Sequence, residues 1–276
     1  MNTRAPDDFQ PIHSETAAGW KVVARHKYRH GMERRVRRLR DDEIESIWSD
    51  EEISDLKSFC RGGGRAIHLQ CAAGLETLFL LSAGADDVIG IDISEDMIDQ
   101  ARELAEAMRA PARFHCCDVL SAPSELDGTA GLVYTGGGAL PWIMDISLWA
   151  DVVARLLHPG GVLYLREGHP IDFLWDREAE DYHLTAGPSY CSGGIIENCG
   201  YPSGLIAMNT DPTGRPVMRE RLWPLGDVIN SLIGVGLDIR HFSEGNDPGW
   251  PAFPNMAKGK LHRLPHTYTL HAEKPA

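Results

Sequence analysis

The chain has 276 residues, of which 43% are hydrophobic, and its formal net charge is −13 at pH 7. This length favours one large domain with an insertion or a lid. The negative charge argues against nucleic acid as the main partner, and no apolar run is long enough to span a membrane. The first residues lack the apolar core of a signal peptide, so we expect a cytoplasmic protein.

The six cysteines are scattered, and no pair has the C-x-x-C spacing typical of a zinc site. We therefore expect no metal and free thiols in a reducing compartment. Cys71 and Cys117 fall in predicted ligand-binding loops, where their small size matters more than their reactivity.

Residues 1–15 are polar and expected to be loose, whereas 16–60 have a helical pattern. Lys21–Arg40 is strongly basic and Asp41–Asp55 strongly acidic. The basic run could suggest RNA, but two solvated helices with compensating charges are the better interpretation. Tyr28 could contact a ligand from this segment, although aromatic residues at helical spacing more often belong to a core.

From residue 62 onward, short buried strands alternate regularly with helices. The predicted strands are 66–70, 87–91, 112–116, 130–134 and 162–167, and the predicted helices are 74–84, 95–109 and 146–157. Ser94 is expected to cap the second of these helices. This alternation predicts a doubly wound, parallel α/β sheet.

The alternation breaks over residues 171–222, which we interpret as an insertion containing two short strands. After it, Pro224 is expected to open a helix at its first position. The expected elements are strands 195–199 and 205–208, helix 224–234, and strands 236–242 and 266–272. The last two strands have no crossover helix between them, which predicts an antiparallel terminal strand.

Residues 66–92 read as strand, tight loop, helix and second strand, with Asp92 at the end of the second strand. This is how an open α/β sheet builds a nucleoside-binding crevice. A dinucleotide site needs several glycines so that the backbone can approach a pyrophosphate, but the loop 71–74 has only Gly74. The loop therefore favours S-adenosylmethionine, which has no phosphate, over NAD.

Four features together resemble the class I S-adenosylmethionine-dependent methyltransferases, in their small-molecule, natural-product branch. They are the loop Gln70-Cys71-Ala72-Ala73-Gly74, the acid Asp92, the pair Cys117-Asp118, and the turn His158-Pro159-Gly160-Gly161 before a strand. The resemblance implies a Rossmann-like, mostly parallel sheet. It divides the chain into an N-terminal helical lid segment, 1–60, and a methyltransferase domain, 61–276, with a substrate-covering insertion at about 171–222.

The resemblance also implies residue roles. Asp92 would hold the ribose hydroxyls, and Asp118 would accept from the adenine amino group, although either acid could instead be a turn residue. Gln70 departs from the family, since many members have an acid there. The implied cofactor-binding residues are Gln70, Cys71, Ala72, Gly74, Thr77, Asp92, Ile93, Met97, Cys117, Asp118, Val119, Thr135 and Gly136.

The implied reaction is methyl transfer to an O or N atom of a small organic acceptor, which we expect to be a secondary metabolite. His169 follows a strand and is our candidate general base, with Tyr134 as a weaker one. A histidine that merely fills a loop is the competing interpretation. The candidate substrate-binding residues are Trp142, Met144, His169 and Tyr28.

Three other functions stay open at this point: an NAD-dependent reductase, a methyltransferase-like scaffold that binds or cyclises without methylating, and a methyltransferase of RNA or protein. We expect a small-molecule partner, no nucleic acid and no membrane. The sequence does not choose between a monomer and a homodimer.

Overall fold

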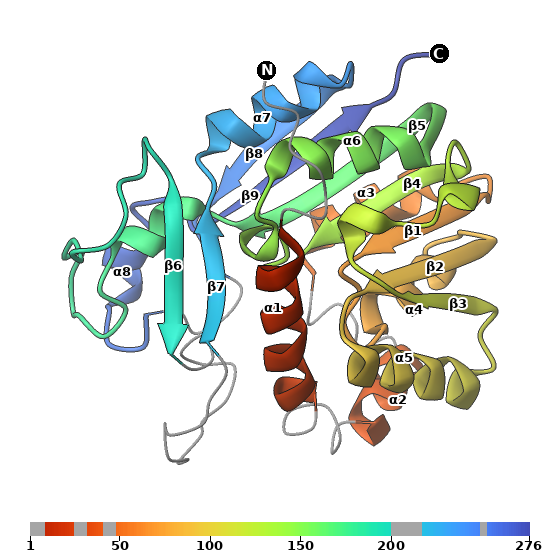
Figure 1. The fold of residues 1–276 in the computed structure, drawn as a ribbon, viewed down its shortest axis with the longest axis horizontal. Helices are drawn as coiled ribbons and strands as arrows, with labels where there is room; N and C mark the ends of the chain where they lie inside the picture. The colour runs from red at the N-terminus through yellow and green to blue at the C-terminus, as the bar shows by residue number, and fades with distance from the viewer. Residues whose placement is uncertain (1–8, 25–31, 41–47, 200–216, 249–252) are drawn as a thin grey trace.

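The computed structural model describes residues 9–24, 32–40, 48–199, 217–248 and 253–276, and its centre is a seven-stranded sheet in the order β3-β2-β1-β4-β5-β9-β8 (Figure 1). Its strands are β1 (Arg65–Leu69), β2 (Asp87–Asp92), β3 (Ala112–Cys116), β4 (Ala130–Gly136), β5 (Leu157–Gly168), β8 (Asp238–Gly245) and β9 (Thr267–Glu273). Strands β1 to β5 pair in parallel, and β9 runs antiparallel to both of its neighbours. This confirms the predicted doubly wound, mostly parallel sheet with an antiparallel terminal strand.

Helices follow the strands in the predicted order. They are α4 (Leu75–Ser82), α5 (Glu95–Met108), α6 (Ile146–Leu156) and α7 (Leu225–Gly234), whereas the short α8 (Lys258–Leu261) was not predicted. Asp145 begins α6 by accepting from the backbone N–H groups of Ser147 and Leu148. Among the described residues, no helix is both long and apolar enough to cross a membrane.

Two details at helix starts differ from prediction. Ser94 stands at the N-cap of α5 but its side chain makes no capping bond, whereas its backbone N–H donates to the Asp92 carboxylate. Pro224 lies just before α7 rather than at its first position, so the ring sets the entry of the helix without belonging to it.

The sheet is covered on both faces, and each strand alternates between them. In β4, Val133 packs with α6 and α7 on one face, whereas Tyr134 packs on the other face against Trp48 and Phe79. The inner strands β1, β2 and β4 are buried on both sides, which explains why their sequences are mostly apolar.

Three helices precede the sheet: α1 (Gln10–Val23), α2 (Met32–Arg40) and α3 (Asp50–Phe59). The expectation that residues 1–15 are loose is wrong from Gln10 onward, because α1 begins there with a proline in its first turn. Helix α3 starts with a capping box, in which Ser49 and Glu52 satisfy each other's backbone N–H groups. Helix α3 packs on the sheet face, while α1 lies beside β7 and α5 (Figure 1).

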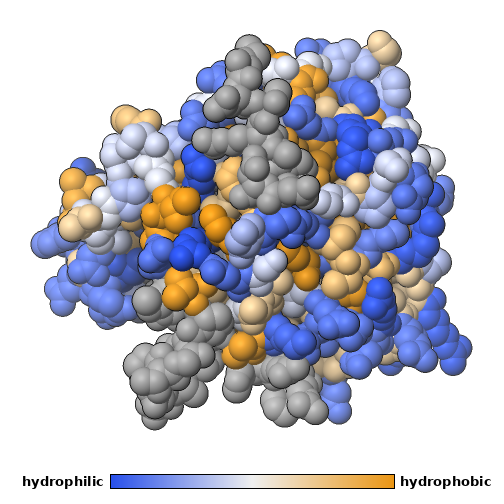
Figure 2. Space-filling model, viewed as in Figure 1, coloured by the Kyte–Doolittle hydropathy of each residue, from blue (hydrophilic) through white to orange (hydrophobic). Residues whose placement is uncertain are grey.

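The insertion contains a separate two-stranded antiparallel sheet of β6 (Gly194–Cys199) and β7 (Val217–Leu222). Strand β6 confirms the predicted strand 195–199, β7 was not predicted, and the predicted strand 205–208 lies outside the described residues. Figure 2 shows hydrophobic side chains gathered over this hairpin, where Ile195 is 48% exposed and Val217 is 38% exposed.

The buried His68 makes stability depend on pH. Its Nδ1 is 2.9 Å from the Thr77 hydroxyl, and burial lowers the pKa of the imidazole from 6.5 to about 3. The unfolded chain therefore takes up this proton near pH 6.5 while the folded chain does not, so the stabilising contribution is present above pH 6.5 and is lost as the pH falls towards 3.

We expect the melting temperature of the His68→Gln variant to fall less steeply than that of the parent between pH 7 and pH 4.5, because the variant lacks this proton uptake. Thermal unfolding followed by circular dichroism measures it, with the partly exposed His115→Gln as control. Parallel pH profiles for the parent and His68→Gln would contradict the assignment.

Candidate functional site

The candidate site lies at the carboxyl edge of the sheet, and its first part is the loop between β1 and α4. Gln70, Ala72 and Gly74 all have left-handed backbone conformations, with φ of 57°, 44° and 78°. For the two residues other than glycine this conformation costs energy, of order 1–3 kcal/mol each. Two hydrogen bonds hold it: Ala72 N–H donates to Asp92 Oδ2 at 2.9 Å, and Gln70 Nε2 donates to Ala139 O at 2.7 Å.

Asp92 is the acceptor that joins the neighbouring loops. Its Oδ1 accepts from Ser94 N–H at 2.9 Å, and its backbone carbonyl accepts from Cys117 N–H at 3.0 Å. Burial raises the pKa of the Asp92 carboxyl to about 6, although the backbone donors, Ala72 among them, pull it down. Each carboxylate oxygen keeps one lone-pair direction beyond these bonds, so the group can still accept from hydroxyls of a ligand.

Of the other residues implied around the nucleoside, Met97 lies beside the loop after β1, whereas Thr77 does not face it. Met97 is buried in a cluster with Ala73 and with Val23 and Ala24 of α1. Thr77 is turned away from the loop, since its hydroxyl bonds His68 in the core.

The two cysteines in these loops have no nucleophilic character. Cys71 is fully buried, and burial raises the pKa of its thiol well above the ordinary value. Burial, reinforced by the charge of Asp118, raises the pKa of the Cys117 thiol to about 11. Both therefore remain thiols at neutral pH, in keeping with their assignment as small loop residues.

Asp118 follows β3 and is buried together with His13, which lies in the N-terminal helix α1. Its Oδ1 accepts from Leu120 N–H at 2.9 Å, and its Oδ2 lies 2.5 Å from Nδ1 of His13 on α1. Val119 beside it is buried in the main core. No local sequence pattern signals the contact between Asp118 and His13, because the two residues are 105 positions apart.

The loop after β4 is fixed by the buried carboxylate of Glu167. Glu167 accepts from the N–H groups of Gly138, Ala139 and Leu140 at 2.6–2.9 Å, and from Gly168 at 3.3 Å. Burial raises the pKa of this carboxyl, and the four backbone donors oppose that rise.

Gly136 and Thr135 lie at the end of β4, next to this loop. A side chain at Gly136 would come within 2.1 Å of the Arg166 carbonyl oxygen, so only glycine fits there. Thr135 is fully buried.

The structure gives His169 a role that argues against a general base. Its Nδ1 accepts from Ile171 N–H at 3.1 Å, so Nε2 carries the proton and donates to Glu244 at 3.0 Å. Both ring nitrogens are thus used, and burial lowers the pKa of the ring even though Glu244 opposes it. His169 begins the short 3₁₀ helix η7 (Pro170–Leu174).

Tyr134, the weaker candidate base, is also placed away from this edge. Its hydroxyl accepts from Trp48 Nε1 at 3.1 Å inside the core, and burial raises the pKa of the phenol above its ordinary value. The alternation of β4 predicts this, since Tyr134 must share a face with Leu132 rather than with Thr135.

The residues expected to contact a substrate are dispersed. Trp142 meets Trp20 of α1 edge to face, with ring centroids 5.3 Å apart, whereas the side chain of Met144 is fully buried. Tyr28 lies outside the described residues. Arg221, from β7, donates to the Met144 carbonyl at 2.9 Å and so ties the insertion to this segment, a contact without a sequence signal.

Several buried polar atoms at this edge have no hydrogen-bond partner within the described structure. Three belong to the sheet's own loops and strand ends: Gln70 Oε1, Ser94 Oγ and Thr135 Oγ1. Buried polar atoms in proteins are nearly always paired. Their position beside Asp92 therefore fits a site built to bind a polar ligand such as the nucleoside and amino-acid parts of S-adenosylmethionine.

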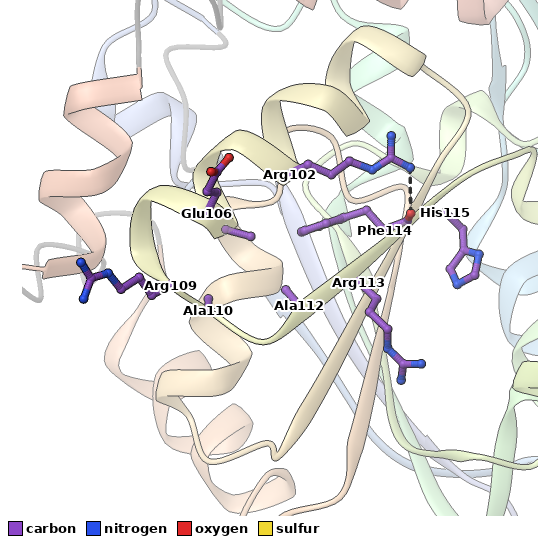
Figure 3. A pocket seen from close by; sticks show the side chains of 9 residues that line it. Arg102, Glu106, Arg109, Ala110, Ala112, Arg113, Phe114 and His115 are labelled. Atoms are coloured by element: carbon purple, nitrogen blue, oxygen red, sulfur yellow. Dashed lines mark hydrogen bonds between the residues drawn. The ribbon is translucent and has the colours of Figure 1, made fainter.

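A surface depression elsewhere does not belong to this site. It lies between α5 and β3, with Phe114 in its lining. Figure 3 shows that Arg102, Arg109 and Arg113 along it point away from one another, and Arg102 already donates to the Phe114 carbonyl. The depression therefore lacks the convergent polar groups of a binding site.

Comparison with known proteins agrees with this geometry. A family model described as a methyltransferase domain matches residues 66–161. An uncharacterized methyltransferase of Schizosaccharomyces pombe is 27% identical over 129 residues, which is 44% of this chain. The matched segment spans 45% of that relative's length.

Two solved structures share the fold. A putative S-adenosylmethionine-dependent methyltransferase from Listeria monocytogenes matches 83% of this chain and 100% of its own, with a TM-score of 0.60 and 18% identity. Geranyl diphosphate C-methyltransferase from Streptomyces coelicolor A3(2) matches 96% of this chain and 98% of its own, with a TM-score of 0.60 and 13% identity.

We expect Glu167→Gln to lower the free energy of unfolding by about 2–3 kcal/mol, since the amide loses the charge and turns N–H groups towards N–H groups. Urea denaturation measures this, with the exposed Glu125→Gln as control. A loss below about 0.5 kcal/mol, the ordinary effect of a surface substitution, would show that Glu167 does not hold the loop.

Proposed function

We propose that this chain, whose residues 66–161 match a methyltransferase domain, transfers a methyl group from S-adenosylmethionine to an oxygen or nitrogen atom of a small organic acceptor. The observation that carries the proposal is Asp92, which ties three loops together at the carboxyl edge and keeps acceptor capacity for a ribose. Ligands of open α/β sheets bind at this edge.

The residues would divide the work as follows. Asp92 would accept from the ribose hydroxyls, Met97 would pack against the adenosine, and Gln70 Oε1 would accept from the amino-acid part. S-adenosylmethionine supplies an electrophilic methyl group, and the electron pair of the broken carbon–sulfur bond stays on sulfur. The protein's task is to hold acceptor and methyl group in line and to exclude water.

Positioning rather than proton transfer would provide the catalysis. Both nitrogens of His169 are engaged, and Tyr134 lies in the core, so neither side chain presents a basic atom to an acceptor. An acceptor that loses its proton readily, such as an amine or an acidic hydroxyl, suits such a site.

The proposal of a small-molecule acceptor is supported by the elements that cover the site. Helix α1 and strand β7 both lie against the segment that holds Trp142, which favours an enclosed acceptor over a polymer. Geranyl diphosphate C-methyltransferase, which shares the fold, binds a small organic molecule, and this is in keeping with an acceptor of that size. The single-glycine loop, with methyl groups at Ala72 and Ala73, disfavours the pyrophosphate of NAD.

We expect the protein to bind S-adenosylhomocysteine, and the affinity to fall about tenfold between pH 7.5 and pH 5. The pKa of Asp92 is about 6, so the carboxylate that accepts from the ribose is charged above this pH and protonated below it. Isothermal titration calorimetry across this pH range measures the effect.

Asp92→Asn should bind more weakly and with little dependence on pH, whereas the exposed Asp99→Asn should behave like the parent. No binding of S-adenosylhomocysteine by the parent, or binding of NADH in its place, would overturn the proposed function. Equal pH profiles for the parent and Asp92→Asn would remove Asp92 from the site.

A further inference from the structure

The inner face of helix α1 closes over the edge of the sheet where the nucleoside is proposed to bind. Its buried residues include His13, Thr16 and Val23, while Ser14 on the opposite face is exposed. Val23 packs with Met97 and Ala73, so the helix extends from Asp118, which His13 contacts, to the loop between β1 and α4.

His13 contacts the carboxylate oxygen of Asp118 that does not accept from Leu120. The Nδ1–Oδ2 distance is 2.5 Å, with His13 3% and Asp118 9% exposed. Because Leu120 N–H binds the other oxygen, both oxygens have a fixed donor and the plane of the carboxylate is set. Two of its four lone-pair directions remain for a ligand.

The same face carries two further polar atoms that the protein does not satisfy. Nε2 of His13 and Oγ1 of Thr16 are buried and have no hydrogen-bond partner in the described structure. A helix that served only as an apolar cover would not bury polar atoms in this way, because each unpaired atom costs about 1–3 kcal/mol. This face is therefore built to meet a polar ligand.

We propose that His13 is a positioning residue that aims Asp118 at the amino group of the purine, and so makes the site selective for adenine. This inference rests on the proposed function. A fixed carboxylate accepts from an amino group but repels the carbonyl oxygen that replaces it in a 6-oxopurine. Sites built to hydrogen-bond one group reject analogues that cannot form the bond by large factors.

The test compares S-adenosylhomocysteine with S-inosylhomocysteine, its deaminated analogue, by calorimetry on the full chain. His13→Asn keeps a donor at the position of Nδ1, whereas His13→Gln moves the donor to the position of Nε2 and away from Asp118. We expect the parent and His13→Asn to prefer the adenine form by on the order of 100-fold. His13→Gln should reduce that preference about tenfold, mainly by weakening the adenine form.

Ser14→Ala is the control on the exposed face of the same helix and should keep the preference of the parent. Circular dichroism and thermal unfolding establish that each variant is folded. Equal weakening of both ligands in His13→Gln would indicate a packing role and overturn the inference, as would tighter binding of either ligand. A parent that binds neither ligand would refute the proposed function itself, whereas a parent that binds both equally would refute only the selectivity.

Discussion

The arrangement of the site depends on one partly buried acceptor, Asp92. Its two carboxylate oxygens hold the loop after β1 and the start of α5, and its carbonyl holds the loop after β3. Parallel strands bring their carboxyl ends to one edge but leave the loops there unconnected. The three hydrogen bonds supply that connection, so the protein can keep Ala72 in a left-handed conformation that would otherwise revert. A ligand that bonds the same carboxylate meets an acceptor whose direction is already set.

Glu167 has the corresponding function on the other half of the edge. It accepts from three backbone N–H groups after β4 and from one at the end of β5, just as Asp92 accepts from donors after β1 and β2. The link between the halves is Gln70, whose amide donates to the Ala139 carbonyl, while the Ala139 N–H donates to Glu167. Two carboxylates and one amide thus connect the loops around the candidate site.

The sequence predicts the sheet well and the contacts between distant segments poorly. Continuous apolar runs with Gly and Pro at their ends identified each central strand, because a strand buried on both faces needs such a run. Tyr134 could also have been placed in the core, since alternation along β4 puts it opposite Thr135. No local pattern announces that His13 meets Asp118, that Arg221 meets the Met144 carbonyl, or that β7 pairs with β6, because these contacts join segments brought together only by the fold.

Gln70 shows how a departure from a family pattern can be explained by its contacts. A carboxylate at this position could accept hydrogen bonds from a ligand, but it has no proton to donate to the Ala139 carbonyl. The amide does both: Nε2 donates to Ala139 at 2.7 Å, and Oε1 remains buried without a partner in the described structure. With glutamine in place of the acid, the negative charge is lost, but a hydrogen bond now joins the loop after β1 to the loop after β4. The acceptor atom Oε1 is kept. Since the carboxylates of Asp92, Asp118 and Glu167 already lie at this edge, a neutral acceptor at Gln70 also avoids adding a further negative charge to it.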